Sequence, residues 1–307
     1  MFRVTIDAFS GRPNPSWIVD NDEDAQEVLR AIAGQREIIS KPDEGFDGLG
    51  YRGMHIQLFG DDSAEDFDLP TSFAFANGTG ENPRQGVEIA ARLIESMTRY
   101  DGIVLPEHQS TPIDESIQKL MLEQLRLYEK NPPKLLPRPP FPVFRRRRIT
   151  VRDERCDQCA IELSRFNPGF WNNNSFVRQN NNCYNYARNW RTDTFAQPGR
   201  ASKCYPYPMA CSDVVNAALC DGLVHRCECL PDSEYPRRFV ALVVAPGYDY
   251  HWYRKQIGNF WGHKPGGTPA KNTDNSSVII TNPETCNRGP YTDFCGYFYA
   301  GKSVKII

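Results

Sequence analysis

The sequence lacks any apolar run close to the ~18 residues that a membrane-spanning helix needs. Its first nine residues also lack the long apolar core of a secretory signal. Neither sign of charge is in large excess, since the chain has 36 Lys and Arg and 38 Asp and Glu, for a net charge of -2. Balanced charge gives no general attraction to nucleic acid or to an anionic membrane. We therefore expect a chain without a membrane span, a nucleic-acid partner or a leader.

Cysteine is absent from the first half of the chain, and all ten cysteines follow Arg155. Such clustering is typical of disulfides, which persist in oxidising compartments, and therefore favours a secreted or extracellular protein. The missing signal segment indicates the opposite, so the location stays open. If one cysteine is a free nucleophile, nine remain, and at least one more must be unpaired.

The composition is that of a globular protein, with 40% hydrophobic and 12% aromatic residues. A length of 307 residues allows two ordinary domains. Residues 131–149 hold six prolines and four consecutive arginines, which favour an extended spacer. We predict a small α/β domain over residues 1–130, a Pro/Arg-rich linker over 131–149 and a second domain over 150–307.

The first domain shows one alternating apolar segment, at positions 2, 4 and 6, which predicts a half-buried strand. Amphipathic helices are expected from near Asp20 and over residues 83–100. A third helix is expected to have Thr111 as its cap and Pro112 at its first position. No residue pattern in this domain indicates chemistry.

The arginine run at 145–148 has three interpretations. Such a run is most often a solvated charge cluster on the surface. It could also be a basic processing site, or a patch that binds phosphate or nucleic acid.

One cysteine has the surroundings that a nucleophile needs, namely an exposed thiolate within reach of a histidine. An asparagine run precedes Cys183, as in a loop or helix cap, and Tyr186, Ala187 and Trp190 keep helical spacing from it. Cys183 would then lie in the first turn of a helix, where the dipole and the free amides lower a thiol pKa and can hold an oxyanion. The alternative is a buried or disulfide-bonded cysteine that starts a helix.

The histidine partner is predicted on a hairpin. Residues 239–245 are an apolar strand, and further strands are expected over 248–255 and 259–263. A three-residue loop with Gly258 in the left-handed conformation would place His251 directly opposite His263. Their Cβ atoms would lie ~4.5–5.5 Å apart, so one ring could take the thiol proton while the other orients it.

The order of these residues resembles a known family. A cysteine, then a histidine on a central strand, then a polar residue about a dozen positions later is the order in NlpC-type amidases and endopeptidases. The segment Asn-Cys-Tyr-Asn-Tyr-Ala at 182–187 is also similar to the nucleophile helix of CHAP amidases. The resemblance covers residues 180–265. It implies a papain-like α+β domain, with an antiparallel sheet and a nucleophile helix.

The resemblance also implies the roles of the site residues. Cys183 would be the nucleophile, His251 the base and His263 the orienting third member, for which Asn259 and Asp274 are competitors.

Substrate-binding residues are expected at Tyr253 and Trp261, which would line a groove suited to stacking on a sugar or peptide. Asn182 and Tyr184, which flank the nucleophile, complete this set. No cofactor and no metal are expected at the site.

The other cysteines are best explained as structural. The pairs Cys156/Cys159 and Cys227/Cys229 could hold zinc, but a one-residue gap chelates poorly, so disulfides are favoured. Cys286 and Cys295 are expected to form a further bridge.

We predict a thiol-dependent hydrolase that cleaves an amide bond in a peptide or peptidoglycan-like substrate through an acyl-enzyme on Cys183. Two alternatives stay open. One is a non-enzymatic, disulfide-stapled secreted binding module. The other is a Cys-His acyltransferase or deamidase toxin.

Overall fold

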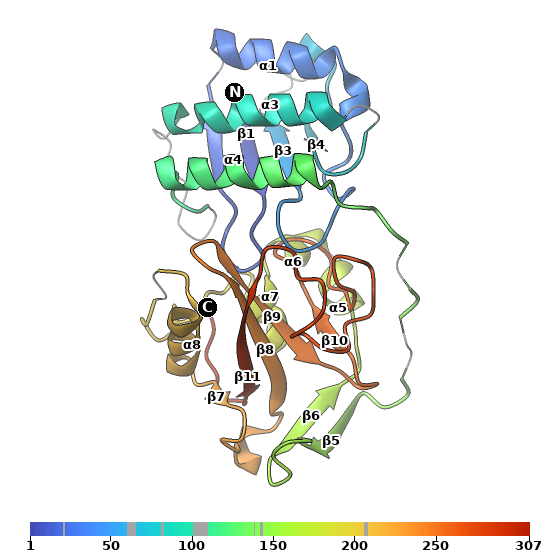
Figure 1. Ribbon diagram of the computed structural model, residues 1–307, viewed down its shortest axis with the longest axis vertical. Helices are drawn as coiled ribbons and strands as arrows, with labels where there is room; N and C mark the ends of the chain where they lie inside the picture. Colours follow the sequence, from blue (N-terminus) through green and yellow to red (C-terminus); the bar gives the residue numbers. More distant parts are fainter. Residues whose placement is uncertain are drawn as a thin grey trace. The chain divides into compact units, whose positions relative to one another are not determined.

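The computed structural model describes residues 1–307 except 21, 60–65, 81–82, 101–109, 138, 142–143 and 206–207. The described chain divides into two compact units. The first comprises residues 1–9 and 13–135, and the second comprises residues 10–12 and 136–307. The division falls inside the proline-rich segment, of which residues 138 and 142–143 lie outside the described part. Both units mix helices with antiparallel sheet, so the chain is α+β (Figure 1).

The first unit contains one four-stranded antiparallel sheet in the order β2-β1-β3-β4. Its strands are β1 (Phe2–Asp7), β2 (Ser16–Val19), β3 (Gly53–Leu58) and β4 (Ser72–Phe75). Its helices are α1 (Glu23–Ala33), η1 (Arg36–Ile38), α3 (Pro83–Ser96), η2 (Met97–Tyr100) and α4 (Glu115–Lys130). Helices α3 and α4 run across one face of the sheet (Figure 1). Burial alternates strictly along β1, as the apolar residues at 2, 4 and 6 predicted.

One helix boundary in this unit was wrong. The third helix begins at Glu115, because the side chain of Asp114 caps it by accepting a hydrogen bond of 2.9 Å from the Ile117 amide. Thr111 instead donates its hydroxyl to the Pro13 carbonyl at 2.6 Å. Two residues with capping side chains lie three positions apart, and only the second satisfies a helical amide.

The second unit contains a five-stranded antiparallel sheet in the order β10-β9-β8-β11-β7 and a two-stranded sheet, β5-β6. Its strands are β5 (Arg148–Arg152), β6 (Ala160–Ser164), β7 (Val224–His225), β8 (Arg238–Ala245), β9 (Asp249–Lys255), β10 (Trp261–His263) and β11 (Asp293–Ala300). Its helices are α5 (Gly169–Asn172), α6 (Ser175–Gln179), α7 (Cys183–Arg188), α8 (Cys211–Cys220) and η3 (Asp232–Glu234).

The core of the second unit lies between the large sheet and two helices. Alternate residues of β8, among them Val240, Leu242 and Val244, share one buried cluster with α7 and α8. Tyr250 and Trp252 of β9 belong to the same cluster. All eight residues of β8 are buried, which explains why the sequence shows an uninterrupted apolar run there instead of an alternating one.

Four disulfides staple the second unit. They join Cys156 to Cys227, Cys159 to Cys229, Cys204 to Cys220, and Cys211 to Cys295. The preference for disulfides over zinc at the two close cysteine pairs is confirmed. The expected bridge between Cys286 and Cys295 is wrong, because Cys295 pairs with a cysteine of α8. Cys183 and Cys286 are free, so a second unpaired cysteine does accompany Cys183.

In the described part of the chain, no helix is both long enough and apolar enough to cross a membrane. The same residues contain no cluster of three or more His, Cys, Asp or Glu side chains that could hold a metal ion.

Candidate functional site

Cys183 is the first residue of α7, as the asparagine run before it predicted. The side chain of Asn182 caps the helix by accepting hydrogen bonds from the amides of Tyr184 and Asn185, at 3.0 and 3.1 Å. Asn185 returns the contact, because its side-chain oxygen accepts from the Asn182 amide at 3.1 Å. This reciprocal capping box fixes the start of a helix of six residues.

The thiol of Cys183 is not activated by its place in the helix. Its side chain has no exposed surface, and Sγ lies 4.0 Å from the carbonyl oxygen of Tyr250 on β9. Burial, and after it the nearby charge of Asp249, raises the pKa of this thiol well above its usual value. The expected lowering by helix amides is therefore outweighed, since desolvation disfavours the thiolate.

His251 and His263 do come together, but not in the predicted register. Tyr253 pairs with His263 and Lys255 with Trp261, so the connection is two residues longer than the three expected. Gly258 and Asn259 both have positive φ, at 96° and 60°. A shift of two residues keeps every side chain on the same face. The two histidines are therefore diagonal neighbours, with His251 Nε2 2.9 Å from His263 Nδ1.

The histidine pair belongs to a polar and aromatic network. His263 Nε2 lies 2.9 Å from the carbonyl oxygen of Thr273, and the ring of His263 stacks on Tyr253 at 5.2 Å. His251 meets Tyr253 edge-on at 4.8 Å. Because side chains alternate along a strand, His251 points to the opposite face of β9 from Tyr250 and Trp252, which pack with Cys183.

The predicted catalytic and substrate-binding residues are all inside the protein. Cys183, His251, His263 and Asn182 have no exposed surface, and Tyr184, Tyr253 and Trp261 are at most 2% exposed. Several have structural partners instead. The Tyr184 hydroxyl donates to Asp221 at 2.9 Å, and Trp261 packs on Phe239 and Tyr297. In the described structure these side chains are therefore closed to a polymeric substrate.

The two competitors for the third catalytic position also have structural roles. Asn259 forms the turn before β10. Asp274 organises a loop, because one carboxylate oxygen accepts from the amides of Ser276 and Val278 and the other accepts from the Asn287 amide.

Asp249 is the residue that the sequence reasoning missed. Its buried carboxylate accepts hydrogen bonds from the successive amides of Ser10, Gly11 and Arg12, and from the hydroxyl of Tyr291. These three residues belong to the second unit. Although its hydrogen bonds favour the charged form, burial dominates and raises the pKa of Asp249. The sequence does indicate that Asp249 needs donors, since an acid inside a buried aromatic strand requires them, but it does not show which residues supply them.

A second missed residue is Lys264, which follows β10. Its ammonium group is buried and donates to the carbonyl oxygens of Arg178, Asn181 and Gly266 at 2.5–2.6 Å. A lysine is almost never fully buried without such partners. This lysine therefore holds the end of α6 and the loop before α7 in place.

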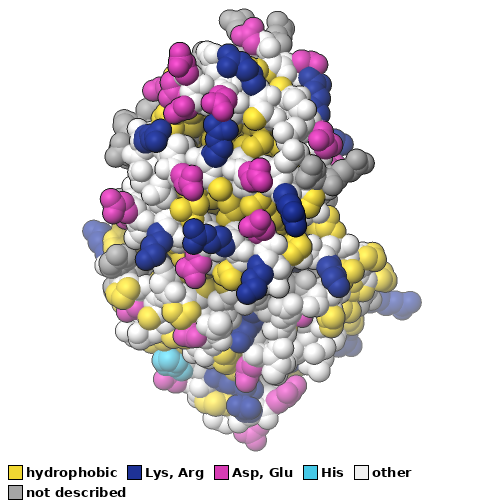
Figure 2. All heavy atoms as spheres, turned by 45° about the horizontal axis from the view of Figure 1, so that its top comes forward, with side chains coloured by type: hydrophobic (Ala, Val, Ile, Leu, Met, Phe, Trp, Pro, Cys, Tyr) yellow, Lys and Arg dark blue, Asp and Glu magenta, His cyan; other side chains and the backbone are white. Residues whose placement is uncertain are grey.

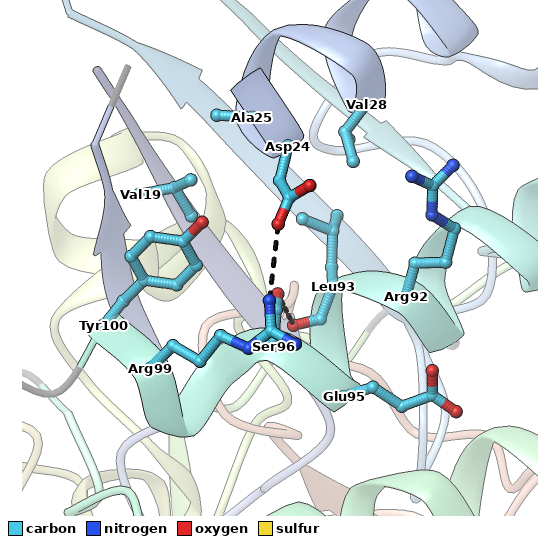
Figure 3. A pocket seen from close by; sticks show the side chains of 10 residues that line it. All are labelled: Val19, Asp24, Ala25, Val28, Arg92, Leu93, Glu95, Ser96, Arg99 and Tyr100. Carbon is cyan, nitrogen blue, oxygen red and sulfur yellow. Dashed lines mark hydrogen bonds and ion pairs between the residues drawn. The ribbon is translucent and has the colours of Figure 1, made fainter. Parts of the chain in front are cut away.

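The first unit contains a pocket of about 190 Å³ between β2, α1, α3 and η2 (Figure 3). Arg99 and Asp24 point toward each other across it and form an ion pair of 3.3 Å. The Ser96 hydroxyl donates to the Leu93 carbonyl at 3.1 Å. In this pocket the charges of Asp24 and Arg99 are therefore paired, and the Ser96 hydroxyl is engaged.

Comparison with known proteins identifies a family that the sequence motifs did not indicate. Over 143 aligned residues the chain is 45% identical to a curated protein of an insoluble shell matrix, and the alignment covers 47% of this chain and 94% of that protein. At this identity and coverage, the chain belongs to the same family. The relative is insoluble matrix shell protein 1 of Ruditapes philippinarum. No family model matches the chain, and no solved structure matches it.

This relationship overturns the predicted activity. The chain was expected to be a cysteine peptidase or amidase, whereas its relative is named as an insoluble matrix shell protein. The hydrolase prediction is wrong, and the peptide or peptidoglycan-like substrate loses its support. The physical reason lies in burial, because the sequence pattern of a nucleophile helix and a histidine strand does not reveal whether the thiol is open to solvent.

Proposed function

We propose that the chain is a non-enzymatic, disulfide-stapled structural component of an insoluble extracellular matrix. The observation that carries this proposal is the 45% identity to insoluble matrix shell protein 1, which extends over nearly all of that relative. The proposal agrees with the alternative that the sequence left open, a secreted module without catalysis.

The architecture supports a passive role. Four disulfides in one unit suit an oxidising environment outside the cell. The charged groups at the centre of this unit are satisfied by structural partners, as Asp249 is by three amides and a hydroxyl. Such a network holds the fold in one arrangement.

Fractionation of the source tissue tests the proposal. The extracellular material is extracted with buffer, then with denaturant, then with denaturant and reductant, and peptides of the chain are quantified by mass spectrometry in each fraction. The chain is expected chiefly in the residue that buffer does not dissolve. Recovery in the buffer extract, in the same share as soluble secreted proteins, would contradict a matrix role.

We further propose that the second unit has a papain-like scaffold that serves structure alone. Two features support this idea. A cysteine begins α7, and this helix packs on β9, the strand that contains His251. An experimental structure of the chain tests it by superposition on papain-like enzymes. A different order of strands around the helix would count against it.

A further inference from the structure

One exposed feature is not used by the fold core or by the proposed role. It is the arginine strip, which we define as Arg145, Arg146, Arg147, Arg148 and Arg152. All five side chains are exposed. Residues 145–152 contain no acidic residue, in a chain whose overall charge is -2. Within the described residues, none of the five guanidinium groups takes part in an ion pair.

The strip ends in an extended strand, whereas Arg145 and Arg147 lie in bends before it. Arg148 to Arg152 form β5, which pairs only with β6 in its two-stranded sheet, so β5 has an outer edge (Figure 1). Burial alternates along β5, with Arg148, Thr150 and Arg152 exposed. Alternate residues of a strand lie about 6.6–6.8 Å apart along its axis. Arg148 and Arg152, four residues apart on the same face of β5, are therefore separated by about 13 Å, too far to form a compact cup for one small anion.

The acids nearest in sequence leave the strip positive. Asp153 is buried and bound to Arg226, whose guanidinium donates to both of its carboxylate oxygens. On the partner strand, Glu162 faces Thr150 but is buried and bound to Arg237 at 2.8 Å. Glu154 and Asp157 are exposed, yet they lie in the turn beyond the end of β5.

An aromatic side chain accompanies the arginines. The Arg148 guanidinium lies 5.3 Å from the ring centre of Tyr235, and its Nη1 donates to the Tyr235 hydroxyl at 3.2 Å. Tyr235 itself is 46% exposed. A half-exposed ring beside guanidinium groups suits a ligand that has both an apolar face and oxyanions, as a sulfated sugar does.

We propose that the arginine strip binds a linear sulfated polysaccharide. Guanidinium groups match sulfate oxygens in pairs, which a lysine could not do. Charges spread along β5 and the segment before it fit an extended chain that has several anions. The choice of a polysaccharide over nucleic acid rests on the proposed extracellular function. On the face of the molecule in Figure 2, in contrast, basic and acidic side chains are interspersed.

Binding of the intact chain to immobilised heparin, the probe for this chemistry, tests the proposal. The variant Arg145→Ala/Arg146→Ala/Arg147→Ala removes three charges but keeps Arg148 and Arg152, which bond to Tyr235 and to the Gln158 carbonyl. We expect its affinity to fall at least tenfold. Its plot of log affinity against log salt should lose a slope of roughly 2–3, by analogy with about 0.9 for each phosphate contact on DNA.

The matched control is Arg30→Ala/Arg84→Ala/Arg126→Ala, which removes three exposed arginines from α1, α3 and α4 of the first unit. It changes the net charge equally and should bind heparin like the wild type. An equal loss of heparin affinity in both variants would mean that net charge alone causes the binding, and would overturn the proposal. Failure of the wild type to bind heparin would also overturn the proposal.

Three competitors identify the ligand class. Desulfated heparin of the same length should compete at least tenfold more weakly than heparin. If poly-L-glutamate or duplex DNA competes better than heparin, the partner is an acidic protein or a nucleic acid, and the proposal is wrong. Recovery of the chain in the buffer-insoluble matrix is measured separately, so failure of heparin binding leaves the matrix role standing, and the reverse also holds.

Discussion

At the scale of single residues, the two free cysteines differ in their surroundings. Cys183 has no exposed surface, whereas Cys286 is half-buried. Burial is the main cause that raises the pKa of Cys286 to about 11, and it raises the pKa of Cys183 well above its usual value. Neither thiol is therefore a reactive thiolate at neutral pH.

We expect iodoacetamide at pH 7.5 to label Cys286 slowly and Cys183 not at all in the folded protein. Denaturation without reductant should make both thiols reactive, and only these two, since the other eight cysteines are bridged. Peptide mapping by mass spectrometry measures each site, and Cys183→Ala provides the reference with one thiol fewer. Rapid labelling of Cys183 in the native chain would show that the thiol is open to solvent, contrary to the structure.

Asp249 gives a second prediction at this scale. One oxygen accepts from the amides of Ser10 and Gly11 and from Tyr291, and the other accepts from the Arg12 amide. In Asp249→Asn, the new NH₂ group would face donors whichever way the amide is turned. We expect the free energy of unfolding to fall by about 2–3 kcal/mol, the scale of a lost charged hydrogen bond and an unsatisfied group.

Urea unfolding followed by tryptophan fluorescence measures this change. Asp293→Asn, at an exposed position in β11, is the matched control and should stay within about 0.5 kcal/mol of the wild type. Equal stability of Asp249→Asn and the control would mean that the three amides do not depend on the carboxylate.

Asp7 predicts a dependence on pH. Burial alone would raise its pKa, but the charge and hydrogen bond of Arg52 hold the pKa below its usual 3.8. A carboxyl with a lowered folded-state pKa contributes stability above about pH 4, which is lost as the pH falls through the folded-state value. The urea midpoint of the first unit should therefore drop below pH 4. Asp7→Asn should lower the midpoint at pH 7 and flatten this part of the curve.

At the scale of elements, α7 is a short helix that depends on its cap. Asn182 accepts from two helical amides, and its Nδ2 donates to the carbonyl oxygens of Gly11 and Ala196, both at 2.7 Å. Helices this short are not stable alone, so their ends have to be fixed by such contacts.

We expect Asn182→Ala to reduce the free energy of unfolding by about 2–3 kcal/mol, since a lost cap costs about 1 and the two carbonyls lose their donors. Asn174→Ala at the exposed cap of α6, which makes one such bond to the Val177 amide, should cost about 1 kcal/mol or less. Thermal unfolding by circular dichroism compares the two. A smaller loss at Asn182 than at Asn174 would contradict this account.

The elements that could be predicted are those whose signal is local. The apolar run at 239–245 and the asparagine cap before Cys183 each lie within a few residues, and both predictions matched the structure. The meeting of His251 and His263 was found in spite of a wrong loop, because an even shift in register preserves the face of each side chain.

What could not be predicted depends on distant partners. Asp249 is satisfied by residues 10–12, more than 230 positions away, and no local pattern links them. The pairing of Cys295 with Cys211 spans 84 residues, and six or more cysteines allow many connectivities. Burial of the thiol is likewise a property of the assembled core. The decisive difference between a nucleophile and a core residue was therefore invisible in the sequence.

At the scale of the whole molecule, the disulfides limit how far the unfolded chain can expand. The bridge between Cys211 and Cys295 closes a loop of 84 residues, and that between Cys204 and Cys220 closes one of 16. In the chain-entropy model, the longer loop contributes about 4–5 kcal/mol and the shorter about 3.

We expect Cys211→Ala/Cys295→Ala to lose about 1–2 kcal/mol more stability than Cys204→Ala/Cys220→Ala. Guanidinium unfolding of both double variants under non-reducing conditions measures the difference. If the short bridge proves the more stabilising, loop entropy is not the main contribution of these bonds.

The bridges Cys156–Cys227 and Cys159–Cys229 join the same two short segments side by side. Asp157 and Gln158, which lie between the first cysteines of the two bridges, are exposed. If the backbone were cut between these two residues, both new ends would stay attached to the segment 227–229, one through Cys156 and the other through Cys159. In the extracellular matrix proposed above, a chain cut at this turn would therefore shed no fragment.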